Sequence, residues 1–350
     1  MVAIGSGRTQ RLIGSNSMKK QILAATAALS FALSIPAQAA EECNDGEMVI
    51  KFSHVVSAKG HPKGEMANAL AARINKEMDG IACMQVFPSS QLFDDDKVME
   101  ALLLGDVQLA APSLAKFEAY SLKYRLFDLP FLFKDMDAVN TFTKGEKGQE
   151  LLLAMSDMGF TGVGYVFNGL KSFSANKPLL VPSDAEGLKF RVQTSDVAVA
   201  MIEAMGGNAQ KLAFKEVYGA LQTGVVDGQE NTWSNIYTKK FFEVQDGITE
   251  TNHQLLTYLA VTSTEWLESL KPDVREQFLK IFNEVADEYN ARSTAINEEN
   301  KQKVIEAGTV VRELTPEQRQ QWVDTMKPVW GKFADDIGQD YIDAAVASNK

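Results

Sequence analysis

Two stretches of this 350-residue chain repeat one pattern, and the repetition limits what the chain can fold into. Residues 101–108 (ALLLGDVQ) and 220–227 (ALQTGVVD) each have the pattern of a helix end, a glycine that stops the helix and a short strand. The chain is also longer than one hydrophobic core usually holds. The sequence therefore predicts two related α/β lobes.

The N-terminus has the pattern of a secretory signal peptide behind an upstream segment, residues 1–17. The basic pair at 19–20 precedes an apolar run over 22–35 and the small-residue site Ala37-Gln38-Ala39. The apolar run is shorter than the roughly 20 residues that a membrane-spanning helix needs, and no later segment qualifies. We therefore expect cleavage after residue 39, a mature protein from about residue 40, and export to a periplasm.

The charge of the exported part excludes some partners. Removal of residues 1–39 takes away four basic residues and no acid, which moves the formal charge from -11 to -15. Such a surface argues against binding to nucleic acid or to anionic lipid. Any cation that lies in a pocket of this protein is therefore informative.

Cys43 and Cys83 are the two cysteines of the sequence. They flank two predicted neighbouring strands, 48–52 and 83–87, and an exported protein folds under oxidising conditions. We predict a disulfide between them. Two free buried thiols are the alternative.

The stretch around Arg191 carries the clearest sign of a ligand site. Residues 187–192 alternate apolar and basic side chains as a strand does, and residues 194–196 offer N-caps for a helix that ends at 206–207. Arg191 thus lies where a strand becomes a helix, which is where ligands gather in α/β sheets. Its planar fork of donors suits a carboxylate. A surface arginine paired with an acid is the alternative.

Polar residues lie close to a tryptophan further along the chain. A predicted helix starts at Phe214 and stops at Gly224, and residues 225–235 follow with Asn231 and Trp233. Asn231 can donate to and accept from a ligand, and Trp233 can cover an apolar carbon chain. We place Asn231, Trp233, Phe214 and Thr194 among the candidate ligand-binding residues.

Three adjacent acids, residues 94–96, precede a predicted helix that ends at Gly105. They lack the alternating spacing of a calcium-binding loop. We expect them to cap the helix, and we predict no metal site.

Several of these segments resemble a known family. GLKFRVQ, AFKEVYGALQTGVVDGQENTWSNIY and FNGLKSFSANKPL are similar to segments of the substrate-binding proteins of TRAP transporters, closest to the C4-dicarboxylate-binding branch. The resemblance runs through nearly the whole mature chain, from IKFSHVVSAKGHPKG to the final helices. It implies a two-lobed periplasmic-binding-protein fold with a hinge.

The lobes of such a fold are built from alternating parts of the chain. We expect lobe I to comprise residues 40–167 and 257–296, and lobe II residues 168–256 and 297–350. An apolar pattern that starts after Pro272 and continues toward Ala307 predicts a helix of more than about 50 Å at ~1.5 Å per residue. The helix is too long for one lobe and should lie along both, as it does in the resembled family.

Four further residues are candidates for the ligand site. The resembled family has a basic residue two positions after an Asn-Gly turn, where this chain has Lys171, and a polar residue where it has His54. Ser113 and Lys116 follow the predicted strand 107–111. The alternatives are a solvated Lys171, a buried hydrogen-bonded His54 and a Lys116 at the rim of the site.

A binding function fits these residues better than catalysis. The sequence has no GxSxG, HExxH or P-loop motif and no cysteine–histidine arrangement, so we expect no enzyme activity and no cofactor. A carboxylate clamp without a reacting group suits a carrier, which releases its ligand unchanged.

The resemblance gives this carrier a role. It implies the periplasmic binding component of a TRAP transporter, a monomer that takes a small-molecule carboxylate, most simply succinate, fumarate or malate, to the small and large membrane subunits. A sugar acid, keto acid or aromatic acid as ligand, or a ligand-presenting sensory module, is the alternative.

Overall fold

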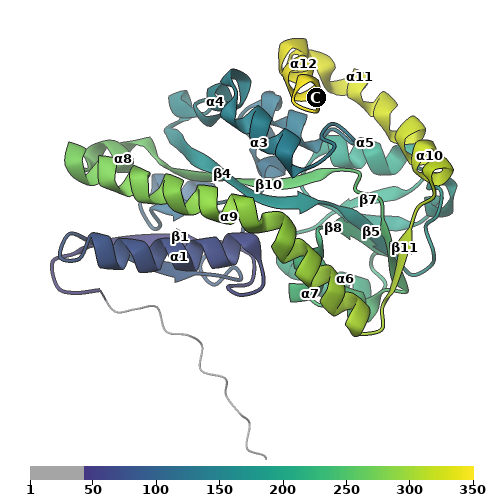
Figure 1. Ribbon diagram of the computed structural model, residues 1–350, viewed down its shortest axis with the longest axis horizontal. Helices are drawn as coiled ribbons and strands as arrows, with labels where there is room; N and C mark the ends of the chain where they lie inside the picture. The colour runs from purple at the N-terminus through teal and green to yellow at the C-terminus, as the bar shows by residue number, and fades with distance from the viewer. Residues whose placement is uncertain (1–42) are drawn as a thin grey trace, which may run out of the picture. The chain divides into compact units, whose positions relative to one another are not determined.

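The computed structural model describes residues 43–350, and these form two β-sheets flanked by helices (Figure 1). The predicted signal peptide lies outside the described residues. The first sheet has the strand order β2 (Ala82–Phe87), β1 (Met48–Ser53), β3 (Leu109–Ala110), β10 (Leu255–Ser263) and β4 (Phe160–Leu170). The second has the order β11 (Val310–Glu313), β9 (Gly247–Glu250), β5 (Ser172–Ala175), β8 (Gly228–Asn231), β6 (Lys189–Val192) and β7 (Asn208–Lys211). We call the first sheet and the helices on it lobe I, and the second sheet with its helices lobe II.

The α-helices fill the connections between these strands. In chain order they are α1 (Pro62–Glu77), α2 (Val98–Leu103), α3 (Met136–Lys144), α4 (Glu146–Leu152), α5 (Asp196–Ala204), α6 (Val217–Gln222), α7 (Trp233–Thr238), α8 (Thr264–Ser269), α9 (Pro272–Glu306), α10 (Pro316–Met326), α11 (Trp330–Ile337) and α12 (Gln339–Ala347). No helix of residues 43–350 has the length and apolar character needed to span a bilayer.

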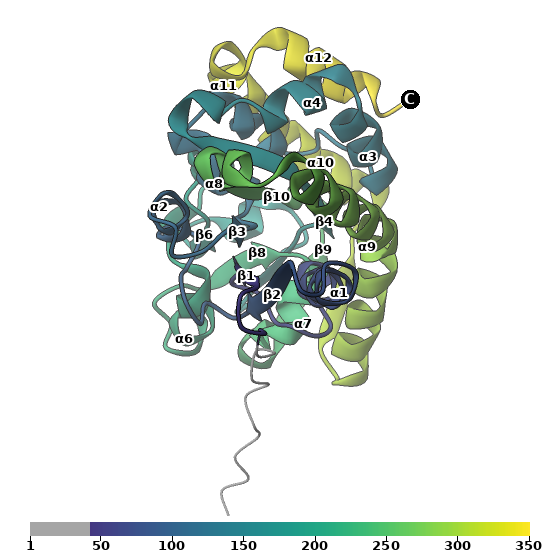
Figure 2. The same cartoon turned by 90° about the vertical axis from the view of Figure 1, so that its left-hand side faces the viewer.

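The first βαβ unit forms as its periodicity predicts. Met66, Leu70, Ile74 and Met78 recur every four residues and are fully buried, because α1 turns this face onto the parallel strands β1 and β2. Phe278 of α9 belongs to the same core. Helices α1 and α9 lie side by side in both views (Figures 1 and 2).

Two strand connections carry the chain between the lobes. Strand β4 of lobe I leads into β5 of lobe II through Lys171, and β9 returns to β10 through residues 251–254. The two connections are hydrogen-bonded: Lys171 N donates to Gln254 O at 2.8 Å, and His253 N donates to Lys171 O at 3.2 Å. This paired backbone is where a hinge between the lobes would bend.

The long helix α9 crosses both lobes, as the sequence predicts. Its 35 residues give a length of about 50 Å. Phe278 and Phe282 in its first half pack in the core of lobe I, whereas Val304 near its end packs against Trp233 and Ile236 of lobe II. The helix is therefore shared by the two lobes (Figure 1).

The C-terminal helices divide between the lobes, which differs from the expected assignment of 297–350 to lobe II. Trp322 of α10 packs in the core of lobe II, but Phe333 of α11 and Ile342 of α12 pack with Phe117 and Tyr124 of lobe I. Both views place α12 next to α3 and α4 (Figures 1 and 2). An amphipathic pattern indicates which face of a helix is buried and does not indicate which lobe covers it.

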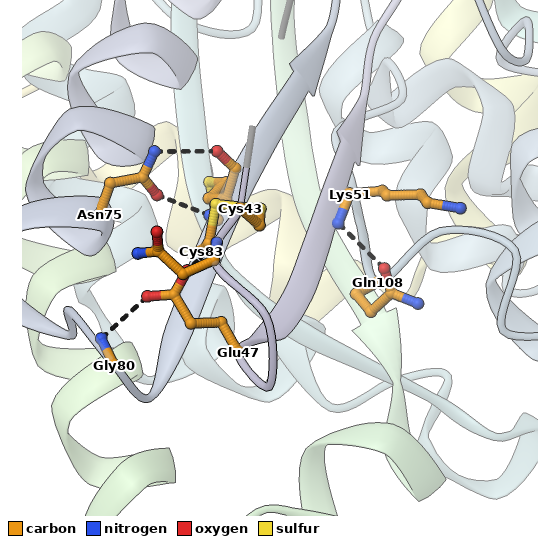
Figure 3. The surroundings of a disulfide bond; sticks show 9 residues. Cys43, Glu47, Lys51, Asn75, Gly80, Cys83 and Gln108 are labelled. Carbon is orange, nitrogen blue, oxygen red and sulfur yellow. Dashed lines mark hydrogen bonds between the residues drawn. A yellow bond between two sulfur atoms is a disulfide. The ribbon is translucent and has the colours of Figure 1, made fainter. Parts of the chain in front are cut away.

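Cys43 and Cys83 form the predicted disulfide, with their Cα atoms 5.6 Å apart (Figure 3). The bond ties the start of the described chain to β2. The neighbouring residue Met84 donates its backbone N–H to Asn75 Oδ1 at 2.6 Å, and Gly80 N donates to Glu47 Oε1 at 2.8 Å. The edge of the first sheet is thus held covalently and by hydrogen bonds.

Replacing both cysteines with serine should lower the free energy of unfolding by about 3 to 4 kcal/mol, because the disulfide closes a loop of 40 residues and restricts the unfolded chain. Urea denaturation of the wild type and the double variant measures the difference. Wild-type protein denatured without reductant should show no alkylatable thiol. A double variant as stable as the wild type would contradict the expected contribution.

Candidate functional site

A pocket lies between the lobes at the carboxyl ends of their strands. Its lining comes from lobe I (Val55, Val56, Ser90, Asp94, Asp95, Asp96, Ser113, Lys116, Leu256, Tyr258) and from lobe II (Arg191, Gln193, Ala213, Phe214, Asn231, Asn235). Five of the predicted ligand-binding residues belong to this lining: Arg191, Ser113, Lys116, Phe214 and Asn231. The structure therefore brings together residues that are far apart in the sequence.

Arg191 supplies a buried positive charge at the end of β6. Arg191 is 2 % exposed. Its Nε and Nη2 donate to Leu212 O at 3.1 and 2.9 Å. Burial lowers the pKa of Arg191 to about 10, so the guanidinium stays charged at neutral pH. Nη1 makes no hydrogen bond within residues 43–350 and can donate to a ligand oxygen.

Lys116 brings a second cation to the pocket from lobe I. Its Nζ lies 2.6 Å from Asp96 Oδ1 and donates to Thr194 Oγ1 at 2.8 Å. Thr194, a predicted ligand-binding residue, does not line the pocket; its hydroxyl contacts Lys116. Because Thr194 belongs to lobe II, the Lys116 ammonium also joins the two lobes.

A buried positive charge lies behind the wall of the pocket. Lys63 is fully buried, its Nζ donates to Ala111 O at 2.7 Å, and it lies 3.6 Å from the ring centroid of Tyr258, a lining residue. Burial lowers the pKa of Lys63 to about 8. The sequence analysis missed Lys63 because a lysine in the first turn of a helix has the ordinary pattern of a solvated residue.

The two asparagines of the pocket, Asn231 and Asn235, belong to one buried network. Asn231 Oδ1 accepts from Asn235 Nδ2 at 2.6 Å, and Asn235 Oδ1 lies 3.1 Å from His61 Nε2. Burial holds the pKa of His61 well below its usual value, so the ring is neutral. The network fixes the orientation of Asn231 and connects it to lobe I.

Lys171 is placed differently from the prediction. It is 1 % exposed and does not line the pocket. Its Nζ lies 2.9 Å from Glu230 Oε2 and donates to Gln254 Oε1 at 2.8 Å and to Gln193 Oε1 at 3.2 Å. The three donors of the ammonium are thus taken by protein groups, which leaves none for a ligand.

Trp233 and His54 also lie outside the pocket lining. The Trp233 ring packs beside Val304 of α9, and its Nε1 donates to Glu250 Oε1 at 3.3 Å. His54 is buried, and burial holds its pKa well below the usual value. A one-residue step along a strand or helix turns a side chain to another face, so a position next to a lining residue in the sequence need not line the pocket.

The acids at 94–96 do more than the predicted capping. Asp94 Oδ1 does accept from Lys97 N at 3.2 Å, one residue before α2 begins. All three acids nevertheless line the pocket. Burial raises the pKa of Asp95, and no group of three or more potential metal ligands occurs in the described part of the chain.

Ion pairs join the lobes around the pocket. Lys215 of lobe II lies 2.9 Å from Asp94 of lobe I, and Arg125 of lobe I lies 2.6 Å from Asp196 of lobe II. With the Lys116–Thr194 bond, these contacts keep the lobes together over the pocket. The arrangement can enclose a small anion and shield it from water.

Comparisons with known proteins show the family of this chain. The model of the family described as bacterial extracellular solute-binding protein, family 7 (DctP) matches residues 52–336. The C4-dicarboxylate-binding periplasmic protein DctP of Vibrio cholerae is 63% identical over 312 residues, which are 89% of this chain and 94% of that protein.

Two solved structures have the same fold. A TRAP periplasmic solute-binding protein from Shewanella oneidensis with bound succinate has a TM-score of 0.85 and 50% identity, over 87% of this chain and 100% of that one. One from Pseudomonas aeruginosa with bound L-malate has a TM-score of 0.80 and 39% identity, over 81% of this chain and 99% of that one. This chain belongs to family 7 of the bacterial extracellular solute-binding proteins.

Proposed function

We propose that this protein is the periplasmic binding component of a TRAP transporter and that it captures a C4-dicarboxylate and delivers it to the membrane subunits. The observation that carries the proposal is the enclosed pocket with Arg191 from one lobe and Lys116 from the other. Two separated cations suit an anion with a carboxylate at each end. The relatives named for C4-dicarboxylates and the neighbours with succinate and malate support the same ligand class.

The charges around the pocket favour an anion in spite of its three aspartates. Asp96 is paired with Lys116 and Asp94 with Lys215, so two of the acids are already neutralised. The third, Asp95, has its pKa raised by burial, and the nearby charges of Lys63 and Lys116 act on it in the opposite direction. Arg191 and Lys63 donate to the backbone carbonyls of Leu212 and Ala111 instead of to a carboxylate, and they supply the positive field.

Arg191→Ala should weaken succinate binding by roughly 3 to 5 kcal/mol, about 150-fold to several-thousand-fold, because the ligand carboxylate loses its buried partner.

Lys116→Met should weaken succinate binding by about 1.5 to 3 kcal/mol and reduce the difference in affinity between succinate and butyrate. Calorimetry at matched ionic strength measures both ligands. The control is Arg312→Ala, which removes an arginine that is paired with Asp246 outside the pocket.

Succinate as the weakest ligand of a panel with sugar acids, keto acids and aromatic acids would contradict the ligand class. Folded Arg191→Ala protein that binds succinate within fivefold of wild type would contradict the clamp. A Lys116→Met variant that weakens succinate and butyrate equally would remove Lys116 from the site of the second carboxylate.

Affinity for succinate should fall as the pH rises from 7 to 9.5. The pKa of Lys63 is lowered to about 8, so its charge is present at pH 7 and is lost above pH 8, and an anion binds better while that charge is present. Lys63→Met should bind more weakly at pH 7 and lose less affinity over this range. Burial also lowers the pKa of Lys239, so the affinity of Lys63→Met should still fall slightly as the pH rises. Equal slopes for both proteins in calorimetric titrations would contradict the role of Lys63.

Ligand should close the lobes about the paired connections at Lys171 and residues 251–254. The free protein should be more extended, because each of the ion pairs between the lobes, Lys215–Asp94 and Arg125–Asp196, includes a side chain that is about half exposed, and a pair of this kind contributes at most about 1 kcal/mol. Small-angle scattering should show a smaller radius of gyration with saturating succinate. Superimposable curves with and without ligand would count against hinged closure.

A further inference from the structure

A buried ion pair lies at the junction of the two sheets, outside the pocket. Lys171 occupies the single position between β4 and β5, and Glu230 lies in β8; both are 1 % exposed. Lys171 Nζ lies 2.9 Å from Glu230 Oε2, so each charge compensates the other. The pair therefore adds no net charge to the neighbouring pocket.

The same ammonium also contacts a residue of the pocket wall. Lys171 Nζ donates to Gln193 Oε1 at 3.2 Å, and Gln193 lines the pocket two residues after Arg191. A lysine ammonium can only donate, so the contact requires the oxygen of the Gln193 amide to face Lys171. The Nε2 group, with its two donors, then faces away from Lys171 and makes no hydrogen bond within residues 43–350.

We propose that Lys171 is a positioning residue, which holds the oxygen of Gln193 so that the amide N–H donors of Gln193 face the ligand carboxylate bound at Arg191. The inference rests on the proposed carboxylate ligand. It makes Gln193 a ligand-binding residue and gives Lys171 an effect on affinity without a direct contact. An unrestrained amide would present its oxygen to the ligand as readily as its nitrogen, and a carboxylate repels that oxygen.

The energetics of buried ion pairs support a role beyond stability. Desolvation of two charges often costs as much as their attraction returns, so a pair of apolar side chains of similar volume would stabilise the fold equally well. What an apolar pair could not do is bind the oxygen of Gln193. The backbone bonds of Lys171 to residues 253 and 254 do not depend on its side chain, so the hinge connection survives substitution.

A double-mutant cycle tests the inference. Lys171→Met, Gln193→Ala and the double variant are titrated with succinate by calorimetry. Each single change should weaken binding roughly 10- to 100-fold, the effect of losing a hydrogen bond to a charged group. If Lys171 acts through Gln193, the double variant should bind within about threefold of Gln193→Ala.

Lys171→Arg supplies the conservative variant, since a guanidinium can also donate to Gln193 Oε1; it should bind within about threefold of wild type. Lys171→Met leaves Glu230 buried without its partner. The variant Lys171→Met/Glu230→Met is therefore made as well, both in the wild-type background and in the Gln193→Ala background. Replacing the whole pair leaves no uncompensated charge, and the same coupling to Gln193 is expected.

Lys171→Met that weakens binding as strongly in the Gln193→Ala background as in wild type would overturn the inference, because Lys171 would then act on the ligand independently of Gln193. Lys171→Met and Lys171→Met/Glu230→Met that both bind like wild type would overturn it too. Wild-type protein that binds no carboxylate overturns the proposed function and this inference together. Wild-type protein that binds the carboxylate, with effects of Lys171→Met and Gln193→Ala that simply add in the double variant, overturns this inference and leaves the proposed function standing.

Discussion

Burying a cation without a carboxylate against it costs free energy, and the structure does this with Arg191. The guanidinium donates to one backbone carbonyl, that of Leu212, and has no ion pair in the described part of the chain. Its lowered pKa expresses that cost. A ligand carboxylate at Arg191 would compensate this charge, which is why we propose an anion as the ligand.

The rest of the fold places the two cations of the pocket on different lobes. Arg191 lies in lobe II and Lys116 in lobe I, and the chain between the lobes crosses through hydrogen-bonded connections. The shared helix α9 packs in the cores of both lobes. If the lobes move about these connections, as we propose, the solvation of the site would change.

The sequence predicted the site best where backbone geometry decides it. Arg191 lies near the end of β6, and Ser113 and Lys116 follow β3. The carboxyl ends of strands meet at the pocket, so a coarse strand prediction places these residues there. Gln193 lies just beyond β6 and follows the same rule, although it was not selected. The two-lobed fold and the long helix likewise follow from chain length and periodicity.

The remaining residues depend on side-chain direction, which periodicity does not provide. Tyr258 was missed because every residue of β10 is buried, so the strand shows no alternation between a pocket face and a core face. Trp233 lies outside the pocket lining, because it is the first residue of α7 and its ring packs with Val304 of α9. Lys171 follows the pattern of the resembled family, but a glutamate at position 230 takes its charge.

The difference between the two pocket cations follows from the groups that each already contacts. Lys116 is paired with Asp96, so a ligand has to share or displace that partner, and the gain in free energy is reduced by what is given up. Arg191 gives up no ion pair when it binds a carboxylate. Under the proposed function we therefore expect Arg191 of lobe II to contribute most of the binding energy, and Lys116 of lobe I to discriminate between ligands with one and two carboxylates.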